Sequence, residues 1–123
     1  ISCPKDQEII HHKHILFNID NCRNESVIVV EGIFDCFRFG NDCCATFGIN
    51  YTKRQLNLLT KYKNIYILFD NDINAKKQAE KLANELSIIG KNVYIIDLPE
   101  KYKDIAEMQQ DEANEFKKQI LNN

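Results

Sequence analysis

The sequence predicts an α/β domain with a central, mostly parallel sheet of about four strands flanked by helices. Short apolar runs rich in β-branched residues recur along the chain without alternating with polar residues, which is typical of strands buried on both faces. Segments with helical spacing separate these runs, so strands and helices alternate. Alternation of this kind is the pattern of βαβ units, whose strands pair in parallel.

The expected strands are residues 27–30, 43–45, 65–69 and 93–96. Residues 14–19 are expected to add a further strand at an edge of the sheet. Residues 1–13 are expected to be an irregular N-terminal segment, so the predicted domain covers residues 14–123. Because the chain begins with Ile1 rather than Met, we expect it to be a piece of a longer protein.

Local signals mark the helices between the strands. Residues 34–39 are expected to form a short helix that ends at Gly40. The next helix, over residues 52–62, opens with Thr52 and Gln55, the spacing of a capping box.

The third helix is expected to begin with Asn74 as its N-cap and to end at Gly90. One face of this helix is apolar and is expected to pack on the sheet. That face comprises Ala75, Ala79, Leu82, Ala83, Leu86 and Ile89. A last helix is expected over about residues 113–121.

Composition narrows the class of protein. The chain has 123 residues, 44% hydrophobic and 28% charged, which fits one globular domain. No apolar run approaches the roughly 20 residues of a membrane span. The net charge of −2 argues against a self-sufficient duplex-binding domain. Four basic residues form either a local phosphate-binding patch or a solvated helix face. They are Lys53, Arg54, Lys61 and Lys63.

The five cysteines are odd in number and contain no C-x-x-C pair, so neither a disulfide framework nor a zinc knuckle is indicated. Cys43 and Cys44 lie in an apolar run, where free cysteine acts as a small core residue. We therefore expect a reducing cytosol.

Acidic residues follow the predicted strands. Glu31 ends the first strand, and Asp70 and Asp72 end the third. Asp35 lies four residues after Glu31, on the same face of the first helix. Asp104 follows the fourth strand after a loop. Ligands of open α/β sheets bind beyond the carboxyl ends of the strands, so these carboxylates are expected to converge.

Carboxylates gathered at one edge repel one another, and a hard divalent cation relieves that repulsion. Mg²⁺ prefers oxygen ligands, and Mn²⁺ is a possible substitute. Such an ion typically holds phosphate oxygens, which favours phosphoryl-transfer chemistry. An Asp after a strand is also often a turn former or a helix cap. Asp104 and Glu107 in particular have the spacing of a cap and its partner.

Four motifs occur in a fixed order: Glu31-Gly32-Ile33-Phe34-Asp35, Ala45-Thr46-Phe47-Gly48, Asp70-Asn71-Asp72 and Lys103-Asp104. Together they strongly resemble the Toprim domain, a Rossmann-like catalytic domain of bacterial-type primases, type IA and type II topoisomerases, and some nucleases and repair proteins. The resemblance covers about residues 14–110. The order and spacing of the motifs are most similar to those of the primase branch.

The resemblance implies a role for each matching residue. Glu31 would be the general base or a metal-site residue, and Asp70 and Asp72 would bind Mg²⁺. Asp35 and Asp104 would belong to an outer acidic cluster. Gly48 would allow a tight turn beside the site, because glycine takes a positive φ readily. Nucleotide or nucleic-acid contacts are expected from Gly48, Lys53, Arg54 and Lys76.

The function implied by the resemblance is Mg²⁺-dependent nucleotidyl transfer in a DNA primase-like protein that makes RNA primers. The full-length protein would bind DNA template and nucleoside triphosphates, act with a replicative helicase or a fused helicase domain, and be cytoplasmic without membrane contact. A zinc-binding module and a basic N-terminal subdomain are not visible in the sequence. We therefore expect the isolated domain to have weak or no activity.

Two positions depart from the primase pattern. Asn74 and Ala75 stand where a small residue and glycine are common, and Ala106 stands where a second acid is usual. A Toprim-type nuclease or topoisomerase-like cleavage domain is an alternative, although no tyrosine has the context of a nucleophile. A non-catalytic Toprim scaffold is another. A receiver-type domain would need an acidic pair after the first strand and a lysine after the last strand. A D-x-D phosphatase would usually carry that motif after the first strand, not the third.

Overall fold

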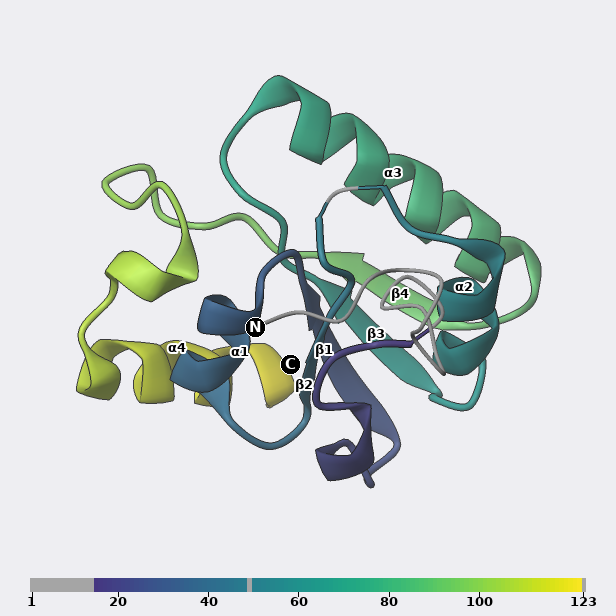
Figure 1. Ribbon diagram of the computed structural model, residues 1–123, viewed down its shortest axis with the longest axis horizontal. Helices are drawn as coiled ribbons and strands as arrows, with labels where there is room; N and C mark the ends of the chain where they lie inside the picture. Colours follow the sequence, from purple (N-terminus) through teal and green to yellow (C-terminus); the bar gives the residue numbers. More distant parts are fainter. Residues whose placement is uncertain (1–14, 49, 123) are drawn as a thin grey trace, which may run out of the picture.

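The computed structural model describes residues 15–48 and 50–122, and within these ranges four parallel strands form one sheet in the order β2-β1-β3-β4. The strands are β1 (Ser26–Val30), β2 (Cys43–Ala45), β3 (Asn64–Ile67) and β4 (Asn92–Ile95). The helices are η3 (Ile19–Asn21), α1 (Ile33–Phe39), α2 (Lys53–Leu59), α3 (Ile73–Ile88), η4 (Ile105–Glu107) and α4 (Gln110–Leu121). Figure 1 shows helices on both faces of the sheet, which confirms the predicted α/β fold.

The register of the central strands places the carboxyl ends of β1 and β3 next to each other. β1 lies between β2 and β3, and Val29 pairs with both Cys44 and Ile67. The backbone pairing continues past β3, where the Leu68 N–H donates to the Val29 carbonyl at 2.8 Å. Because the strands are parallel and in this register, the segments that begin with Glu31 and Asp70 leave the sheet side by side.

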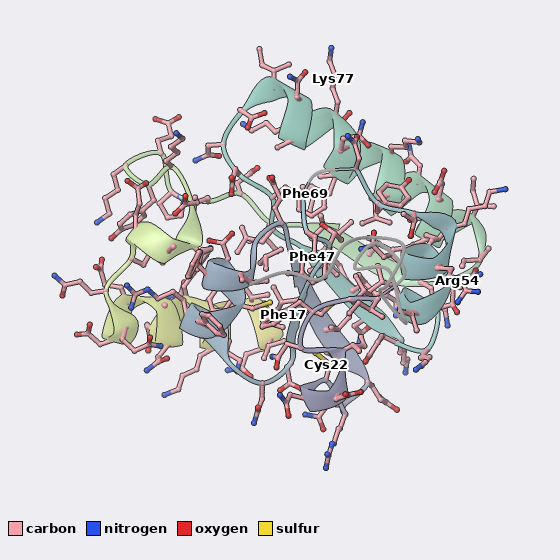
Figure 2. The ribbon with its side chains drawn as sticks, viewed as in Figure 1. Phe17, Cys22, Phe47, Arg54, Phe69 and Lys77 are labelled. Carbon is pink, nitrogen blue, oxygen red and sulfur yellow. The ribbon has the colours of Figure 1, made fainter. Side chains whose placement is uncertain are left out.

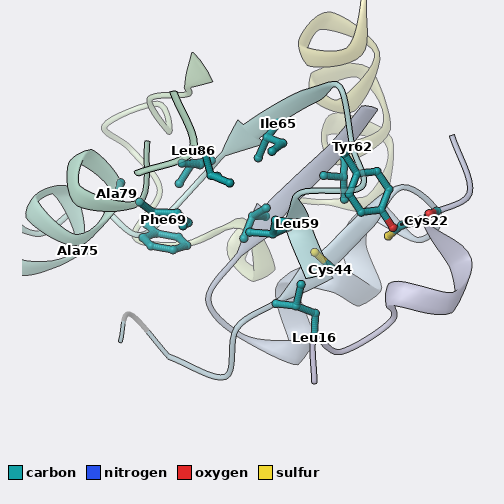
Figure 3. Close-up of a cluster of buried hydrophobic side chains, with 14 residues drawn as sticks. Leu16, Cys22, Cys44, Leu59, Tyr62, Ile65, Phe69, Ala75, Ala79 and Leu86 are labelled. Carbon is teal, nitrogen blue, oxygen red and sulfur yellow. Dashed lines mark hydrogen bonds between the residues drawn. The ribbon is translucent and has the colours of Figure 1, made fainter. Parts of the chain in front are cut away.

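The face of the sheet covered by α2 and α3 is apolar and closely packed. Leu82 and Leu86 on α3 and Leu59 on α2 are fully buried against β1 and β3 (Figure 3). Full burial of one such leucine stabilises the fold by roughly 1.5–3 kcal/mol. This cluster also includes Ala75, so it holds the start of α3 against the sheet. The turn formed by Asp70-Asn71-Asp72 (the D-x-D turn) directly precedes this helix.

The opposite face is covered by α1, η4 and α4. Cys36 and Phe39 of α1 pack with Ile105 of η4 and with Met108 and Ile120. This cluster fixes the loop that leads from β4 to α4 beside α1, as Figure 1 shows on its left side. The loop carries Lys103 and Asp104.

Strand β4 differs from the expectation of burial on both faces. Tyr94 is 48% exposed and Ile95 44% exposed, whereas Val27 to Val30 of β1 are fully buried. Within the described residues β4 pairs with β3 alone, so it lies at an edge of the sheet. The Tyr94 ring stacks on that of Tyr66, with centroids 5.2 Å apart.

The helix ends follow from local side-chain chemistry. α1 ends at Gly40, whose φ of 72° lies in the left-handed region and whose N–H donates to the Cys36 carbonyl at 2.7 Å. The predicted capping box of α2 is confirmed, because the Thr52 hydroxyl accepts the Gln55 N–H and the Gln55 side chain accepts the Thr52 N–H. α4 begins at Gln110, three residues before the predicted start.

The prediction that Asn74 caps α3 is wrong. Asp72 is the N-cap, because its backbone is extended and its Oδ1 accepts the Ala75 N–H at 2.8 Å. α3 therefore starts before Asn74, which lies in its first turn. At the other end Ile89 is 52% exposed rather than packed, since α3 stops at Ile88.

The predicted strand over residues 14–19 is reduced to one bridge in the described part of the chain. Phe17 pairs antiparallel with Ala45 at the edge of β2, and η3 follows at once. The expectation for residues 1–13 and residue 14 lies outside the described residues, and the domain boundary near residue 14 stays a prediction.

The cysteines of the described segments are core residues, which was expected for Cys43 and Cys44. Cys22, Cys36, Cys43 and Cys44 are buried free thiols. Separately, none of the helices described is both long and apolar enough to cross a membrane.

Candidate active site

A cleft of about 610 Å³ opens at the carboxyl ends of β1 and β3. Acidic side chains from three separate segments line it, and its acidic lining residues are Glu31, Asp35, Asp70 and Asp104. The expected convergence of the strand-end carboxylates is therefore confirmed for these four residues.

Glu31 and Asp70 are joined directly. The Glu31 Oε1 accepts the backbone N–H of Asp70 at 2.7 Å, which links the end of β1 to the end of β3. The pKa of Glu31 is raised to about 7, first by burial and then by the negative charges of Asp70, Asp72 and Asp35. The hydrogen bond from Asp70 opposes this shift because it favours the ionised carboxylate.

Asp70 is the least satisfied acid of the cleft. Across residues 15–48 and 50–122 its carboxylate takes part in no hydrogen bond or ion pair. Its pKa is raised to about 6, first by burial and then by the charges of Asp35, Asp104 and Asp72, while the charge of Lys103 opposes the rise. A half-buried carboxylate with charged neighbours and no donor is an available ligand for a cation.

Asp35 has a different environment. Its Oδ1 accepts the Ala106 N–H at 3.1 Å, and the Nε of Arg38 donates to the Ala106 carbonyl at 3.3 Å. Two side chains of α1 thus hold the peptide groups on either side of Ala106. Burial, followed by the charge of Asp104, raises the pKa of Asp35, and bonds to the backbone of Ala106 and Gly32 oppose the rise.

Asp104 and Asp72 both act as helix caps. The predicted Asp104–Glu107 cap is confirmed, because Asp104 accepts the Glu107 N–H at 3.2 Å and the Glu107 side chain reaches back to the Asp104 N–H. Asp104 nevertheless lines the cleft. Asp72 is exposed at the start of α3 and does not belong to that lining.

The glycine turn beside the cleft has the expected geometry. Gly48 has a φ of 124°, and its N–H donates to the Glu31 carbonyl at 2.9 Å. Phe47, just before it, has a φ of 65°. The turn is anchored from α2, because the buried Gln55 Nε2 donates to the Thr46 carbonyl at 2.8 Å.

The basic residues expected to contact nucleotides lie elsewhere. Lys53 and Arg54 are exposed on the first turn of α2, and Lys76 is exposed on the first turn of α3. None of the three lines the acidic cleft. Figure 2 shows Arg54 on the α2 side of the molecule, across the view from α4. The positive charge that lowers the pKa of Asp70 belongs to Lys103. From the sequence, Lys103 was identified only as part of the Lys103-Asp104 motif.

Asn71 is a site residue that the sequence reading missed. Its Nδ2 donates to the carbonyls of Leu98 at 3.1 Å and Tyr102 at 3.2 Å. These bonds tie the D-x-D turn to the loop that carries Asp104. The amide within an acidic motif was the available signal, because Asn in such a turn often bonds neighbouring backbone.

The donor set suits a hard divalent ion, although its side chains are not gathered as a ligand group. In the described part of the chain no three His, Cys, Asp or Glu side chains stand close enough together to form a ready metal site. The chemistry of the cleft still fits such an ion, since its acids supply only oxygen ligands. Burial, with added repulsion from neighbouring carboxylates, raises the pKa values of Glu31 and Asp70. Small side-chain movements would be required to close a coordination shell.

The fold and the acidic cleft define a class of α/β proteins in which carboxylates from neighbouring parallel strands meet beyond the sheet. A Toprim-like family model matches residues 28–109, a range that includes all five acids discussed above. The chain belongs to this Toprim-like family.

Curated relatives are DNA primases. The chain is 38% identical over 80 residues to the DNA primase of Aquifex aeolicus (strain VF5), an alignment of 61% of this chain and 16% of that protein. It is 26% identical over 101 residues to the DNA primase of Staphylococcus epidermidis (strain ATCC 12228 / FDA PCI 1200), covering 74% of this chain and 17% of that one. The chain therefore spans about a sixth of the length of these relatives.

A solved structure shows the same similarity. The crystal structure of the Aquifex aeolicus primase, comprising zinc binding and RNA polymerase domains, matches with a TM-score of 0.74 and 30% identity. The match covers 94% of this chain and 31% of that chain. The predicted Toprim fold with primase similarity is thus confirmed.

Proposed function

We propose that this domain supplies the divalent-metal-dependent acidic centre of a DNA primase-like nucleotidyltransferase, which joins ribonucleotides into a primer on a DNA template. The observation that carries the proposal is the contact of Glu31 with Asp70 at the ends of neighbouring strands, in a cleft lined by further acids. The similarity to DNA primases supports the choice of reaction.

In this reaction the 3′-hydroxyl oxygen of the growing strand attacks the α-phosphorus of a nucleoside triphosphate, and the bond to pyrophosphate breaks. The hydroxyl proton must be removed as the new bond forms. Glu31 is the proposed acceptor, since a pKa of about 7 lets one carboxylate take up and release a proton near neutral pH. Its bond to the Asp70 N–H holds Oε1 in place and leaves Oε2 as the proton-accepting atom.

Asp70 and Asp72 are the proposed ligands of Mg²⁺, with Mn²⁺ as a substitute, and Asp35 and Asp104 form an outer acidic group. When bound, the ion would neutralise phosphate charge and lower the pKa of the attacking hydroxyl. Asp72 Oδ1 caps α3, so Oδ2 is the atom available to the ion. The Asp35 carboxylate joins α1 to η4 through the Ala106 N–H, and Asp104 caps η4, so both residues also have a positioning role.

The remaining contacts belong to the longer protein in this proposal. Lys53, Arg54 and Lys76 are exposed and would meet template or nucleotide phosphates outside the cleft, with Gly48 leaving room at its rim. DNA template, nucleoside triphosphates and a replicative helicase or fused helicase domain are the proposed partners, and the cytoplasm is the proposed location.

Metal binding is tested by titrating the ¹⁵N-labelled chain with Mn²⁺ and Mg²⁺ and following amide NMR signals. Paramagnetic broadening should centre on residues around Glu31 and Asp70 and should disappear in Asp70→Asn. Asp97→Asn, an exposed acid on the loop after β4, is the matched control and should bind as the unaltered chain does. Unperturbed signals around Glu31 at millimolar metal would refute the centre.

The reaction is tested in a longer protein that contains this domain. Primer synthesis from ribonucleoside triphosphates on single-stranded DNA should require Mg²⁺ or Mn²⁺ and fall by at least about 100-fold in Glu31→Gln, as expected for loss of a general base. Metal-dependent cleavage of DNA without primer synthesis would instead assign the domain to the nuclease or topoisomerase-like class. Metal binding with neither reaction would assign a scaffold role.

A further inference from the structure

A row of four aromatic rings runs along α1 beside the acidic cleft. We define the aromatic row as Phe34, Phe37, Phe17 and Phe47. Successive rings meet edge to face, with centroids 6.0 Å apart for Phe34 and Phe37, 5.7 Å for Phe37 and Phe17, and 6.1 Å for Phe17 and Phe47. Figure 2 shows Phe17 and Phe47 one above the other near the middle of the molecule.

The aromatic row is packed on the core at Phe17 and exposed to solvent at Phe34 and Phe37. Phe17 packs against the core cluster beneath α1, whereas Phe34 is 68% exposed and Phe37 62% exposed. Large apolar side chains are normally exposed singly, so adjacent exposed rings on a helix of this size indicate a binding surface. Core packing does not account for Phe34, whose ring lies on the solvent side of α1.

The open rings form the wall of a second groove. A groove of about 340 Å³ is lined by Phe34, Phe37, Arg38, Ala106 and Gln110. This volume falls within the roughly 300–1,000 Å³ of small-ligand sites. Phe34 and Ala106 also line the acidic cleft, so the groove and the cleft adjoin across them.

The acidic cleft and the groove beside it differ in charge. The cleft is lined by four carboxylates, whereas Arg38 is the charged residue of the groove lining. Arg38 uses Nε for the bond to the Ala106 carbonyl, and no other hydrogen bond of its guanidinium is found within residues 15–48 and 50–122. Aromatic faces together with an available guanidinium suit a planar base that is attached to a phosphate.

We propose that the groove beside Phe34 and Phe37 binds an unpaired nucleobase of single-stranded nucleic acid, with Arg38 contacting its phosphate. The strand would then reach the acidic cleft across Phe34. This inference rests on the proposed function for the identity of the occupant, and it assigns a base-stacking subsite that the acidic centre does not require. Stacking on an aromatic ring tolerates any base, so binding would be largely independent of sequence.

The test uses two fluorescent 12-mers of equal charge: oligo-dT and an abasic deoxyribose-phosphate strand. Binding of each strand to the chain is measured by fluorescence anisotropy in 50 mM salt and EDTA. Oligo-dT should bind and the abasic strand should bind at least about tenfold more weakly, the loss expected when a stacked base is removed. Phe34→Leu and Phe37→Leu keep the apolar surface and should each weaken oligo-dT binding by about tenfold, while Phe34→Trp should retain it.

Ile88→Ala is the matched control, because Ile88 is 84% exposed at the far end of α3. Equal binding of the two strands, unchanged affinity in Phe34→Leu, or absence of oligo-dT binding would each overturn the subsite. Self-association that Phe34→Leu abolishes, without oligo-dT binding, would assign the aromatic row to a second copy of the chain and also overturn it. Metal binding at Glu31 and Asp70 is measured separately, so failure of one proposal does not imply failure of the other.

Discussion

The Glu31 carboxylate accepts the backbone N–H of Asp70 at 2.7 Å, across the junction of two neighbouring parallel strands. This bond fixes one oxygen of Glu31 to the main chain of the D-x-D turn. It also holds two carboxyl groups close together in a partly buried cleft, where burial and then the charge of Asp70 raise the pKa of Glu31.

The metal-free chain should lose stability as the pH rises from about 4 to about 7. The pKa of Glu31 is raised from 4.5 to about 7 and that of Asp70 from 3.8 to about 6, so the folded state holds protons that the unfolded state has released. The stabilisation is complete below the unfolded values and is lost as the pH passes through the folded ones. Melting temperatures in EDTA at pH 4.5 and pH 7.5 measure the effect, and Glu31→Gln should flatten the profile. A profile that rises over this range would contradict the assignment.

Asp70→Asn should stabilise the metal-free chain at pH 8 and remove its response to divalent metal. The substitution removes a half-buried charge that has acidic neighbours, and the gain should be about 1 kcal/mol or less because solvent screens the group. Unfolding in urea with EDTA measures the gain, and melting with 5 mM Mg²⁺ or Mn²⁺ measures the response. If Asp70→Asn is still stabilised by the ions as much as the unaltered chain, Asp70 is not a ligand.

Substitutions of Asp72 should separate capping from metal binding. Asp72→Ala should destabilise the chain by about 1 kcal/mol, because the Ala75 N–H loses its partner. Asp72→Ser keeps a capping oxygen and should restore most of that stability while still weakening Mn²⁺ binding. Denaturant unfolding and Mn²⁺ titration together report both effects. Full metal affinity in Asp72→Ser would leave Asp72 with the capping role alone.

Asn71→Ala should loosen the loop that carries Asp104 without unfolding the domain. The substitution leaves the carbonyls of Leu98 and Tyr102 without their amide donor, with an expected cost of about 1–3 kcal/mol. Faster amide hydrogen exchange should be confined to residues 98–107 and the D-x-D turn. Asn74→Ala, on the exposed side of the first turn of α3, is the control and should leave exchange in this loop unchanged.

Gln55→Leu should destabilise the fold and disturb the turn at Gly48. Gln55 is fully buried, and its Nε2 donates to the carbonyls of Ile15 and Thr46. An apolar side chain of similar size removes both of these hydrogen bonds, with an expected cost of about 2–4 kcal/mol. Thermal unfolding measures the loss, and Arg54→Leu on the exposed face of the same helix should change stability by no more than about 0.5 kcal/mol.

The features that could be predicted from sequence are those set by local patterns. The apolar runs identified the strands, and parallel pairing then brought Glu31 and Asp70 to one edge. The capping box of Thr52 and Gln55 and the positive φ of Gly48 also follow from residue type. Each of these depends on neighbours in the chain or on a general property of parallel sheets.

The features that could not be predicted depend on contacts between distant segments. Asp72 and Asn74 are both good capping residues. Asp72 is the N-cap because the chain turns into α3 directly after it. The bond from Ala106 to Asp35 joins residues 71 positions apart, and no local pattern reports it. The exposure of β4 follows from its place at the edge of the sheet, which single-sequence patterns do not specify.

Ala106 occupies a position where an acid was expected, yet it joins the site through its main chain. Its N–H and carbonyl are both held by α1, and neither bond requires a particular side chain. The residue type at this position should therefore vary widely among related domains. Proline should be excluded, because it has no N–H to donate to Asp35. A deep mutational scan that reports folding stability should find position 106 permissive to polar and apolar residues alike and intolerant of proline.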